Sequence, residues 1–205
     1  MNPRIVFSIL LGSFGLILAF LPSPGTARLT ENPKTLLYQS IEKSAYFSVD
    51  QVARFVVSED STVLLVDLRN PIDFKQVSIP GSINIPYNQL LNKETNLESY
   101  FADNKKRVIF YSNGDLYSGY ALVLARGLGF ANSYSMKGGL NEWFSTVMNS
   151  AFTGDRISAR ENALFETRTR AKKYFTEINS LPDSLKLQFA QKSSFDPKKL
   201  DGGCE

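Results

Sequence analysis

Histidine is absent from this 205-residue chain, and cysteine occurs once, as Cys204 beside the C-terminus. Without an imidazole the protein lacks the most common general base, a frequent metal ligand and the usual switch near neutral pH. A single thiol excludes an internal disulfide framework and a metal site built from several cysteines. The sequence therefore predicts no metal and no cofactor.

An excess of charge of either sign is also missing. The 23 basic and 20 acidic residues leave a net charge of +3, which is too small to indicate a nucleic-acid partner. What is present is the composition of a globular protein, with 43% hydrophobic and 21% charged residues. A chain of this length has room for one domain of ordinary size with additional segments at its ends.

The longest apolar run lies at the N-terminus. Arg4 precedes residues 5–21, which carry no charge, and residues 22–27 then combine two prolines with small side chains that a signal peptidase can read. As a helix the run would span roughly 25 Å, slightly less than a bilayer core of about 30 Å. We predict that residues 1–27 are a signal peptide or a membrane anchor. With Arg4 on the inner side, the remainder is expected in the periplasm or another extracytoplasmic space.

Between residues 46 and 148 short apolar strands alternate with helical patterns. Strands are predicted at residues 62–67, 82–86, 107–111 and 133–136. Helices are predicted after Ser48, which has capping-box spacing to Gln51, and over residues 117–128 and 140–147. This alternation predicts an α/β domain with a parallel sheet and helices on both faces.

The segments on either side of this domain have different patterns. Residues 28–45 are predicted to be a linker with a short helical stretch, and residues 149–205 to be a helical C-terminal extension with a flexible tail. From residue 157 to residue 178 the apolar side chains follow the spacing of an amphipathic helix. Two roles are open for that helix. It packs back on the α/β domain, or it presents basic residues to anionic headgroups or an acidic partner.

Two stretches of the domain resemble the signatures of rhodanese-like domains. Asp67-Leu68-Arg69, Asp73-Phe74 and the run Ile-Pro-Gly-Ser-Ile-Asn-Ile-Pro at residues 79–86 resemble the first signature. Met-Lys-Gly-Gly-Leu-Asn-Glu-Trp at residues 136–143 resembles the glycine-glycine-tryptophan ending. A strand, loop and helix at residues 111–121 stand between them, where that family keeps its active site. The resemblance covers residues 46–148 and implies a rhodanese-like parallel sheet.

The resemblance also implies a loop that lacks the chemistry of active members. Those members carry a sulfane sulfur on a thiolate at the first loop position, and an arginine later in the loop commonly binds the anionic donor. This chain has Ser112 and Tyr117 at these positions, Asp115 between them, and Val77-Ser78 where glycine-histidine often stands. A serine hydroxyl cannot hold a persulfide and is barely ionised without a base. We therefore interpret the domain as a catalytically degenerate member.

The residues of this region have both a ligand-binding and a structural interpretation. The candidate ligand-binding loop consists of Ser112, Asn113, Gly114, Asp115, Leu116, Tyr117 and Ser118, with Asp67 and Arg69 adjacent to the pocket. As structural residues, Ser112 and Ser118 are expected to cap the following helix while Gly114 permits a turn. Asp67 and Arg69 are expected to form an ion pair or hydrogen bond beside the loop.

These observations favour a noncatalytic rhodanese-like module at the outer side of a bacterial-type cytoplasmic membrane, which binds another protein or a small ligand. The membrane is a further partner if the N-terminal segment is retained. Tyr111, Tyr117 and Tyr120 are expected at the rim of the pocket, either as local packing or as a partner-binding surface. The alternative is a sulfur-handling protein that uses the thiol of Cys204 on its tail.

Overall fold

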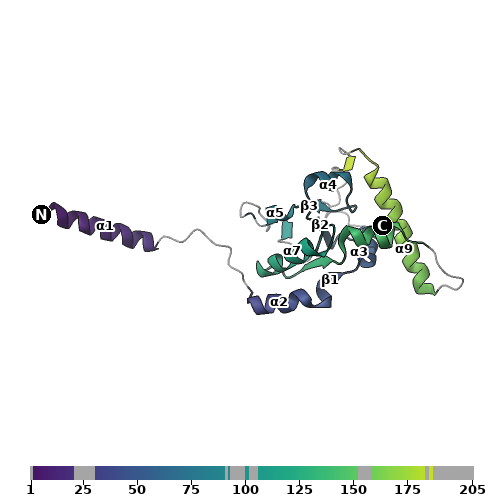
Figure 1. The fold of residues 1–205 in the computed structure, drawn as a ribbon, viewed down its shortest axis with the longest axis horizontal. Helices are drawn as coiled ribbons and strands as arrows, with labels where there is room; N and C mark the ends of the chain where they lie inside the picture. Colours follow the sequence, from purple (N-terminus) through teal and green to yellow (C-terminus); the bar gives the residue numbers. More distant parts are fainter. Residues whose placement is uncertain are drawn as a thin grey trace, which may run out of the picture.

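A wholly parallel sheet forms the centre of the domain (Figure 1). It has five strands in the order β1-β5-β4-β2-β3. The strands are β1 (Tyr46–Phe47), β2 (Val63–Asp67), β3 (Ile83–Asn84), β4 (Arg107–Tyr111) and β5 (Ser133–Met136). The computed structural model describes residues 2–20, 31–90, 92, 100–101, 106–151, 158–182 and 185–186. The predicted α/β class with a parallel sheet is confirmed.

Helices connect the strands and extend the chain at both ends. Before the sheet lie α1 (Pro3–Phe20), α2 (Pro33–Ile41) and the short 3-10 helix η1 (Lys43–Ala45). Within the domain are α3 (Val49–Val57), α4 (Pro71–Gln76), α5 (Tyr87–Leu90), α7 (Asp115–Gly127), α8 (Gly139–Trp143) and the π-helical turn η2 (Phe144–Met148). The long helix α9 (Ala159–Asn179) follows. Among the described residues, no helix is both long enough and apolar enough to cross a membrane.

The sheet is covered on both faces because successive side chains of its strands point to opposite sides. Ile109 of β4 joins a buried cluster with α3, α8 and α9, whereas its neighbours Val108 and Phe110 join a second cluster with α5 and α7. Burial on both faces is typical of parallel sheets. It explains why β2 and β4 appear in the sequence as continuous apolar runs.

The capping box predicted at the start of α3 is present. The backbone N–H of Ser48 donates to Oε1 of Gln51 at 2.9 Å, and the N–H of Gln51 donates to the hydroxyl of Ser48 at 3.3 Å. This reciprocal pair satisfies donors that a helix end leaves open. It fixes the point where the chain turns from β1 into α3.

Two elements of the domain have no counterpart among the predicted ones. Strand β1 has two residues and pairs with β5, so it is too short to show a hydrophobic period. Helix α4 has six residues, with Pro71 in its first position. Its N-cap is Asn70, whose side-chain oxygen accepts from the N–H of Asp73 at 2.9 Å. The Asn-Pro pair was the available signal for this helix start.

The predicted linker, residues 28–45, contains a helix that is fixed to the domain. Asn32 caps α2 by accepting a hydrogen bond from the N–H of Lys34 at 2.9 Å. Leu36 is buried, and α2 packs against α7. The Arg126 Nη1 of α7 donates to the carbonyl of Gln39 at 3.0 Å. Helix α2 is therefore part of the folded unit rather than a connection to it.

The C-terminal helix α9 packs on the α/β domain, which is the first of the two roles considered for it. Ala171 and Phe175 are buried in the cluster with α3, and the ring of Phe175 lies 6.0 Å from that of Trp143. Arg168 Nε and Nη2 donate to the carboxylate of Asp50 on α3 at 2.6 and 2.7 Å. The extension thus covers one face of the sheet, and Figure 1 shows α9 and α2 on different sides of the domain.

Candidate functional site

The candidate site is the loop that joins β4 to α7. Ser112 follows the last residue of β4 and is 5% exposed. The backbone carbonyls of Ser112 and Asn113 accept hydrogen bonds from the N–H groups of Leu140 and Asn141, at 2.9 and 3.0 Å. These two bonds fasten the loop to the first turn of α8. The loop and the glycine pair before Leu140 therefore form one unit.

The contact between this loop and the start of α8 leaves no room for a side chain at Gly139. Its φ is +57°, and a Cβ atom there would lie 2.5 Å from the carbonyl oxygen of Ser112 and 2.7 Å from the carbonyl carbon of Asn113. Gly138 also adopts a positive φ, of +75°. Both positions favour glycine because a side chain disfavours this backbone region. The glycine pair of the second signature thus has a structural role in positioning the loop.

Asp115 places a carboxylate in the loop. Its Oδ1 accepts a hydrogen bond from the backbone N–H of Gly138, and the residue stands in the first turn of α7. The N-terminal end of a helix carries a partial positive charge, which a carboxylate there compensates. A second anion entering the loop would therefore meet a like charge.

The loop offers backbone N–H groups, at residues 113–117, to which a ligand or partner can bind. These N–H groups have no hydrogen-bond acceptor among the described residues. The hydroxyl of Ser112 likewise makes no hydrogen bond within the described part of the chain. A run of open N–H groups where a strand turns into a helix suits an acceptor oxygen of a ligand or partner.

The expected caps of α7 do not form. Gly114 is the N-cap residue, with an extended φ of −143° that any residue adopts, and no side chain caps this helix. Ser118 is buried inside α7, and its hydroxyl donates back to the carbonyl of Asp115 at 3.1 Å. Serine has both options, capping a helix end or bonding to a carbonyl one turn earlier. The helix consequently begins at Asp115, two residues before its predicted start.

A buried ion pair lies beside the loop at the end of β2. The register pairs Asp67 with Tyr111, and Asp67 is fully buried while Arg69 is 8% exposed. Arg69 Nη2 lies 2.6 Å from Asp67 Oδ2, and Arg69 Nε donates to Asp67 Oδ1 at 3.0 Å. Burial opposes the charge of Arg69, but the hydrogen bonds and charge of Asp67 outweigh it and raise the pKa of Arg69. The expected ion pair between the two side chains is therefore present.

Tyr111 lies in the core, so its expected place at the rim is wrong. It is fully buried, and its hydroxyl accepts from the N–H of Ile79 at 3.2 Å. The hydroxyl of Ser82 lies 2.8 Å from that of Tyr111 and donates to the carbonyl of Ile79 at 2.6 Å. Burial and then the negative charge of Asp67 raise the pKa of Tyr111 well above its ordinary value. Tyr111 is therefore a neutral, hydrogen-bonded core residue.

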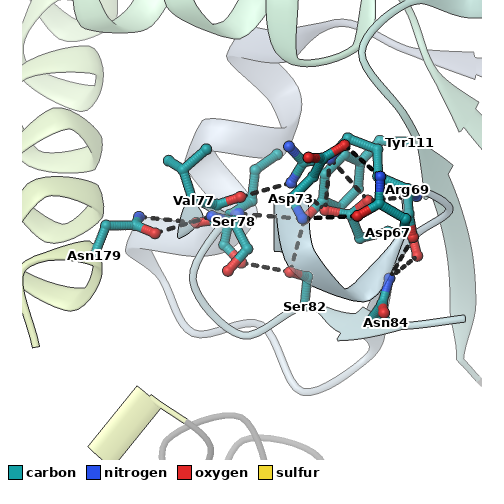
Figure 2. A network of polar contacts seen from close by, with 11 residues as sticks. Asp67, Arg69, Asp73, Val77, Ser78, Ser82, Asn84, Tyr111 and Asn179 are labelled. Carbon is teal, nitrogen blue, oxygen red and sulfur yellow. Dashed lines mark hydrogen bonds and ion pairs between the residues drawn. The ribbon is translucent and has the colours of Figure 1, made fainter. Parts of the chain in front are cut away.

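The ion pair is connected to the C-terminal extension, as Figure 2 shows. Arg69 Nη2 also donates to the carbonyl of Val77 at 2.6 Å. Ser78 then exchanges two hydrogen bonds with Asn179, the last residue of α9, each of 2.9 Å. The Val77-Ser78 segment is thus held between the end of β2 and the end of α9.

Three side chains that hydrogen-bond in this region are not predicted as site residues from the sequence. Asn84 Nδ2 donates to the carbonyls of Asp67 and Arg69 at 3.0 and 2.9 Å. Ser82 and Asn84 belong to the first signature, which was the signal available for them. Asn179 has no such signal, because its partner Ser78 is 101 residues away in the sequence.

An exposed aromatic surface lies next to the loop. Tyr117 and Tyr120 of α7 are 48% and 52% exposed, and the ring of Tyr87 lies 5.0 and 6.4 Å from theirs. Leu116 is exposed as well. Tyr117 and Tyr120, two of the three tyrosines expected near the loop, are therefore exposed beside it, and Tyr87 packs against them.

The described residues show no metal site in this region, and the tail thiol lies outside them. Within the described ranges, no group of three or more cysteine, aspartate and glutamate side chains is arranged to bind a metal. Cys204 and the tail predicted around it lie outside the described residues. The role of that thiol stays a prediction.

Comparison with known proteins connects this geometry to a family. Residues 48–146 match the rhodanese-like domain. A thiosulfate:glutathione sulfurtransferase of Saccharomyces cerevisiae is 32% identical over 107 residues, which cover 48% of this chain and 77% of that protein. The chain belongs to the rhodanese-like domain family.

Two further similarities involve the same yeast. A mitochondrial thiosulfate sulfurtransferase is 32% identical to this rhodanese-like chain over 107 residues, which cover 48% of the chain and 72% of the yeast protein. The crystal structure of a single-domain yeast sulfurtransferase is 28% identical, with a TM-score of 0.43, and the match covers 51% of this chain and 92% of that one.

The close contact at Gly139 predicts a strongly position-dependent effect of adding one methyl group. We expect Gly139→Ala to lower the free energy of unfolding by about 2–4 kcal/mol, because the Cβ clashes with the loop and the positive φ is strained. The matched control is Gly119→Ala in α7, where a Cβ meets nothing within 4 Å. That change should stabilise the helix by about 0.5–1 kcal/mol. Urea unfolding followed by circular dichroism measures both, and equal effects would contradict the proposed role of Gly139.

The buried Tyr111 predicts a component of alkaline unfolding. An unfolded tyrosine ionises near pH 10, whereas the raised pKa of Tyr111 keeps it protonated in the native state. Above about pH 10 the native state therefore binds more protons than the unfolded state, and stability falls as pH rises. Between about pH 10 and about pH 11, the free energy of unfolding of Tyr111→Phe should fall by about 1 kcal/mol less than that of the unmodified chain.

The substitution has a separate cost at neutral pH. Tyr111→Phe leaves the N–H of Ile79 without its acceptor, which we expect to lower stability by about 1–3 kcal/mol. The control is Tyr38→Phe, because Tyr38 is an exposed tyrosine outside the core. Urea titrations across the alkaline range test this, and identical slopes for Tyr111→Phe and the unmodified chain would show the account to be wrong.

Proposed function

We propose that this chain is a noncatalytic rhodanese-like module that binds a protein partner or a small ligand. The observation that carries the proposal is Ser112 at the first position of the loop, in a chain whose sole cysteine is Cys204. The sulfur transfer named for the yeast relatives requires a sulfur nucleophile, and the thiolate is the reactive form of cysteine. A serine hydroxyl accepts no sulfane sulfur, so the loop serves binding rather than transfer.

The charges of the loop support the same function. Asp115 supplies a negative charge at the N-terminus of α7, where a thiosulfate anion would have to approach. Tyr117 stands where active members commonly carry the arginine that binds the donor. Arg69 is paired with Asp67 and with the carbonyl of Val77, so its charge is already compensated. An anionic sulfur donor therefore finds little attraction here.

The aromatic surface and the open N–H groups support a binding role. Tyr117, Tyr120 and Leu116 expose apolar surface beside the loop, and tyrosine is enriched at the centres of protein interfaces. The N–H groups of residues 113–117 would donate hydrogen bonds to a carbonyl or hydroxyl oxygen of the bound partner. Together they form an apolar contact surface with a polar side that fixes orientation.

The location is part of the proposal. Arg4 before an apolar segment of 17 residues, followed by prolines and small residues, supports export across a bacterial-type cytoplasmic membrane or tethering at its outer side. Both forms place the rhodanese-like domain in the periplasm or an equivalent space. Retention of the segment makes the membrane a second partner.

The first test is enzymatic. We expect the purified full chain to show no thiosulfate:cyanide sulfurtransferase activity above the buffer rate, because no thiol occupies the loop. Cyanide-dependent thiocyanate formation measures it, with Cys204→Ser as the matched control. Turnover that survives Cys204→Ser overturns the noncatalytic assignment, and turnover that disappears with it supports the alternative in which Cys204 carries sulfur.

The second test concerns location. A reporter fused after Ile157 should be active outside the cytoplasm in bacterial cells, whereas the same fusion without residues 1–27 should stay inside. Alkaline phosphatase activity distinguishes the two, because that enzyme matures only outside. A full-length fusion that is inactive and protected in the cytoplasm would refute the topology. N-terminal sequencing of the mature chain then shows whether the segment is cleaved or retained.

A further inference from the structure

Helix α2 presents an apolar stripe to solvent on the side opposite to its packed side. Leu36 is 5% exposed, whereas Leu37, Tyr38 and Ile41 are 65%, 59% and 69% exposed. At about 100° per residue, positions i, i+1 and i+4 lie on one side of a helix. A helix that is apolar on both sides is normally buried on both sides. The outer stripe of Leu37, Tyr38 and Ile41 therefore lacks a cover within the described chain.

The stripe is held in a fixed orientation by bonds at the C-terminal end of α2. The hydroxyl of Tyr46 donates to the carbonyl of Ser40 at 2.6 Å. Arg126 donates to the carbonyl of Gln39 at 3.0 Å and, through Nε, to that of Ser133 at 3.1 Å. Because these bonds tie α2 to β1 and to α7, its outward side is a constant feature of the domain surface.

The charges around the stripe do not favour a charged partner. The exposed charged residues of this segment are Glu31, Lys34, Glu42 and Lys43, two of each sign. A balanced set gives neither a basic nor an acidic surface. Three side chains are also far short of the roughly 800 Å² per partner that a stable dimer interface buries. The stripe therefore suits contact with the apolar part of a lipid layer better than contact with a complementary protein surface.

The segment before α2 indicates that a lipid bilayer is the apolar environment near the stripe. Helix α1 carries no charge after Arg4, and its described large side chains between Ile5 and Leu16 are exposed. Eleven steps of chain separate Phe20 from Glu31, which reach roughly 40 Å at full extension. When α1 is retained in a bilayer, α2 is therefore confined to the neighbourhood of the membrane surface.

We propose that α2 is an interfacial helix that inserts Leu37, Tyr38 and Ile41 into the lipid surface and so orients the rhodanese-like domain on the membrane. The inference rests on the tethered form of the proposed function. Tyrosine is enriched at membrane interfaces, where its ring is apolar and its hydroxyl reaches water. Because the surrounding charges balance, apolar burial drives the contact, which depends little on anionic lipid or on salt.

The experiment places a fluorophore on the stripe of the full chain. In a Cys204→Ser background, Ile41→Cys is labelled with a polarity-sensitive dye, and Thr169→Cys on the exposed side of α9 is the matched control. The proteins are mixed with phosphatidylcholine vesicles, with or without phosphatidylglycerol and spin-labelled lipid. We expect a blue shift and quenching at position 41 but not at position 169, unchanged by phosphatidylglycerol or by salt.

The outcomes separate this inference from the proposed function. A dye at position 41 that stays in water while the protein sediments with vesicles overturns the inference and leaves the tether intact. Failure to sediment at all overturns both the tether and the inference, without touching the noncatalytic assignment. If the dye at position 41 is already blue-shifted before vesicles are added, and the shift grows with protein concentration, then the stripe contacts a second copy of the chain. That outcome overturns the lipid contact. Leu37→Cys, on the same stripe, replaces Ile41→Cys if that variant fails to fold.

Discussion

The buried pair of Asp67 and Arg69 is the constraint on which the carboxyl end of the sheet depends. Two charges are removed from water there, a cost that only close geometry and further hydrogen bonds offset. Both conditions are met by the 2.6 Å contact and by the bond from Arg69 to the carbonyl of Val77. Because either charge alone would be unpaired and buried, the pair acts as a unit. It fixes the path of the chain from β2 through α4 to β3, with Asn84 holding the backbone of both residues.

The same constraint connects the rhodanese-like domain to the helix added after it. Val77 is held by Arg69, and the next residue, Ser78, is bonded to Asn179 of α9. Before the domain, Arg126 holds the carbonyl of Gln39 in α2 in a similar way. Each added helix lies outside residues 48–146 and is attached by side chains that bond to backbone groups. The family fold thus carries an extra helix at each end, with α2 packed against α7 and α9 packed against α3.

The loop between β4 and α7 has a tightly fixed backbone, and its side chains are those for which we propose a noncatalytic role. Gly139 and the carbonyls of Ser112 and Asn113 form a tight contact that depends on shape alone. Asp115 adds a negative charge that opposes an anionic donor. A loop of this kind can be kept for binding, because open N–H groups and exposed tyrosines do not require a nucleophile. The backbone shape of the loop therefore does not depend on which reactive side chain stands at its first position.

The sequence by itself determined the α/β class, the parallel sheet and the family, because strand runs, the Ser48 capping box and the two signatures are local patterns. The tertiary structure alone decided the burial of Tyr111, since strand residues alternate between two faces and both faces are covered here. It also decided the role of Ser118, whose hydroxyl is able either to cap a helix end or to bond back to a carbonyl one turn earlier. The bond between Ser78 and Asn179 joins residues 101 positions apart. Such contacts arise from packing between distant segments, for which a single sequence holds no periodic signal.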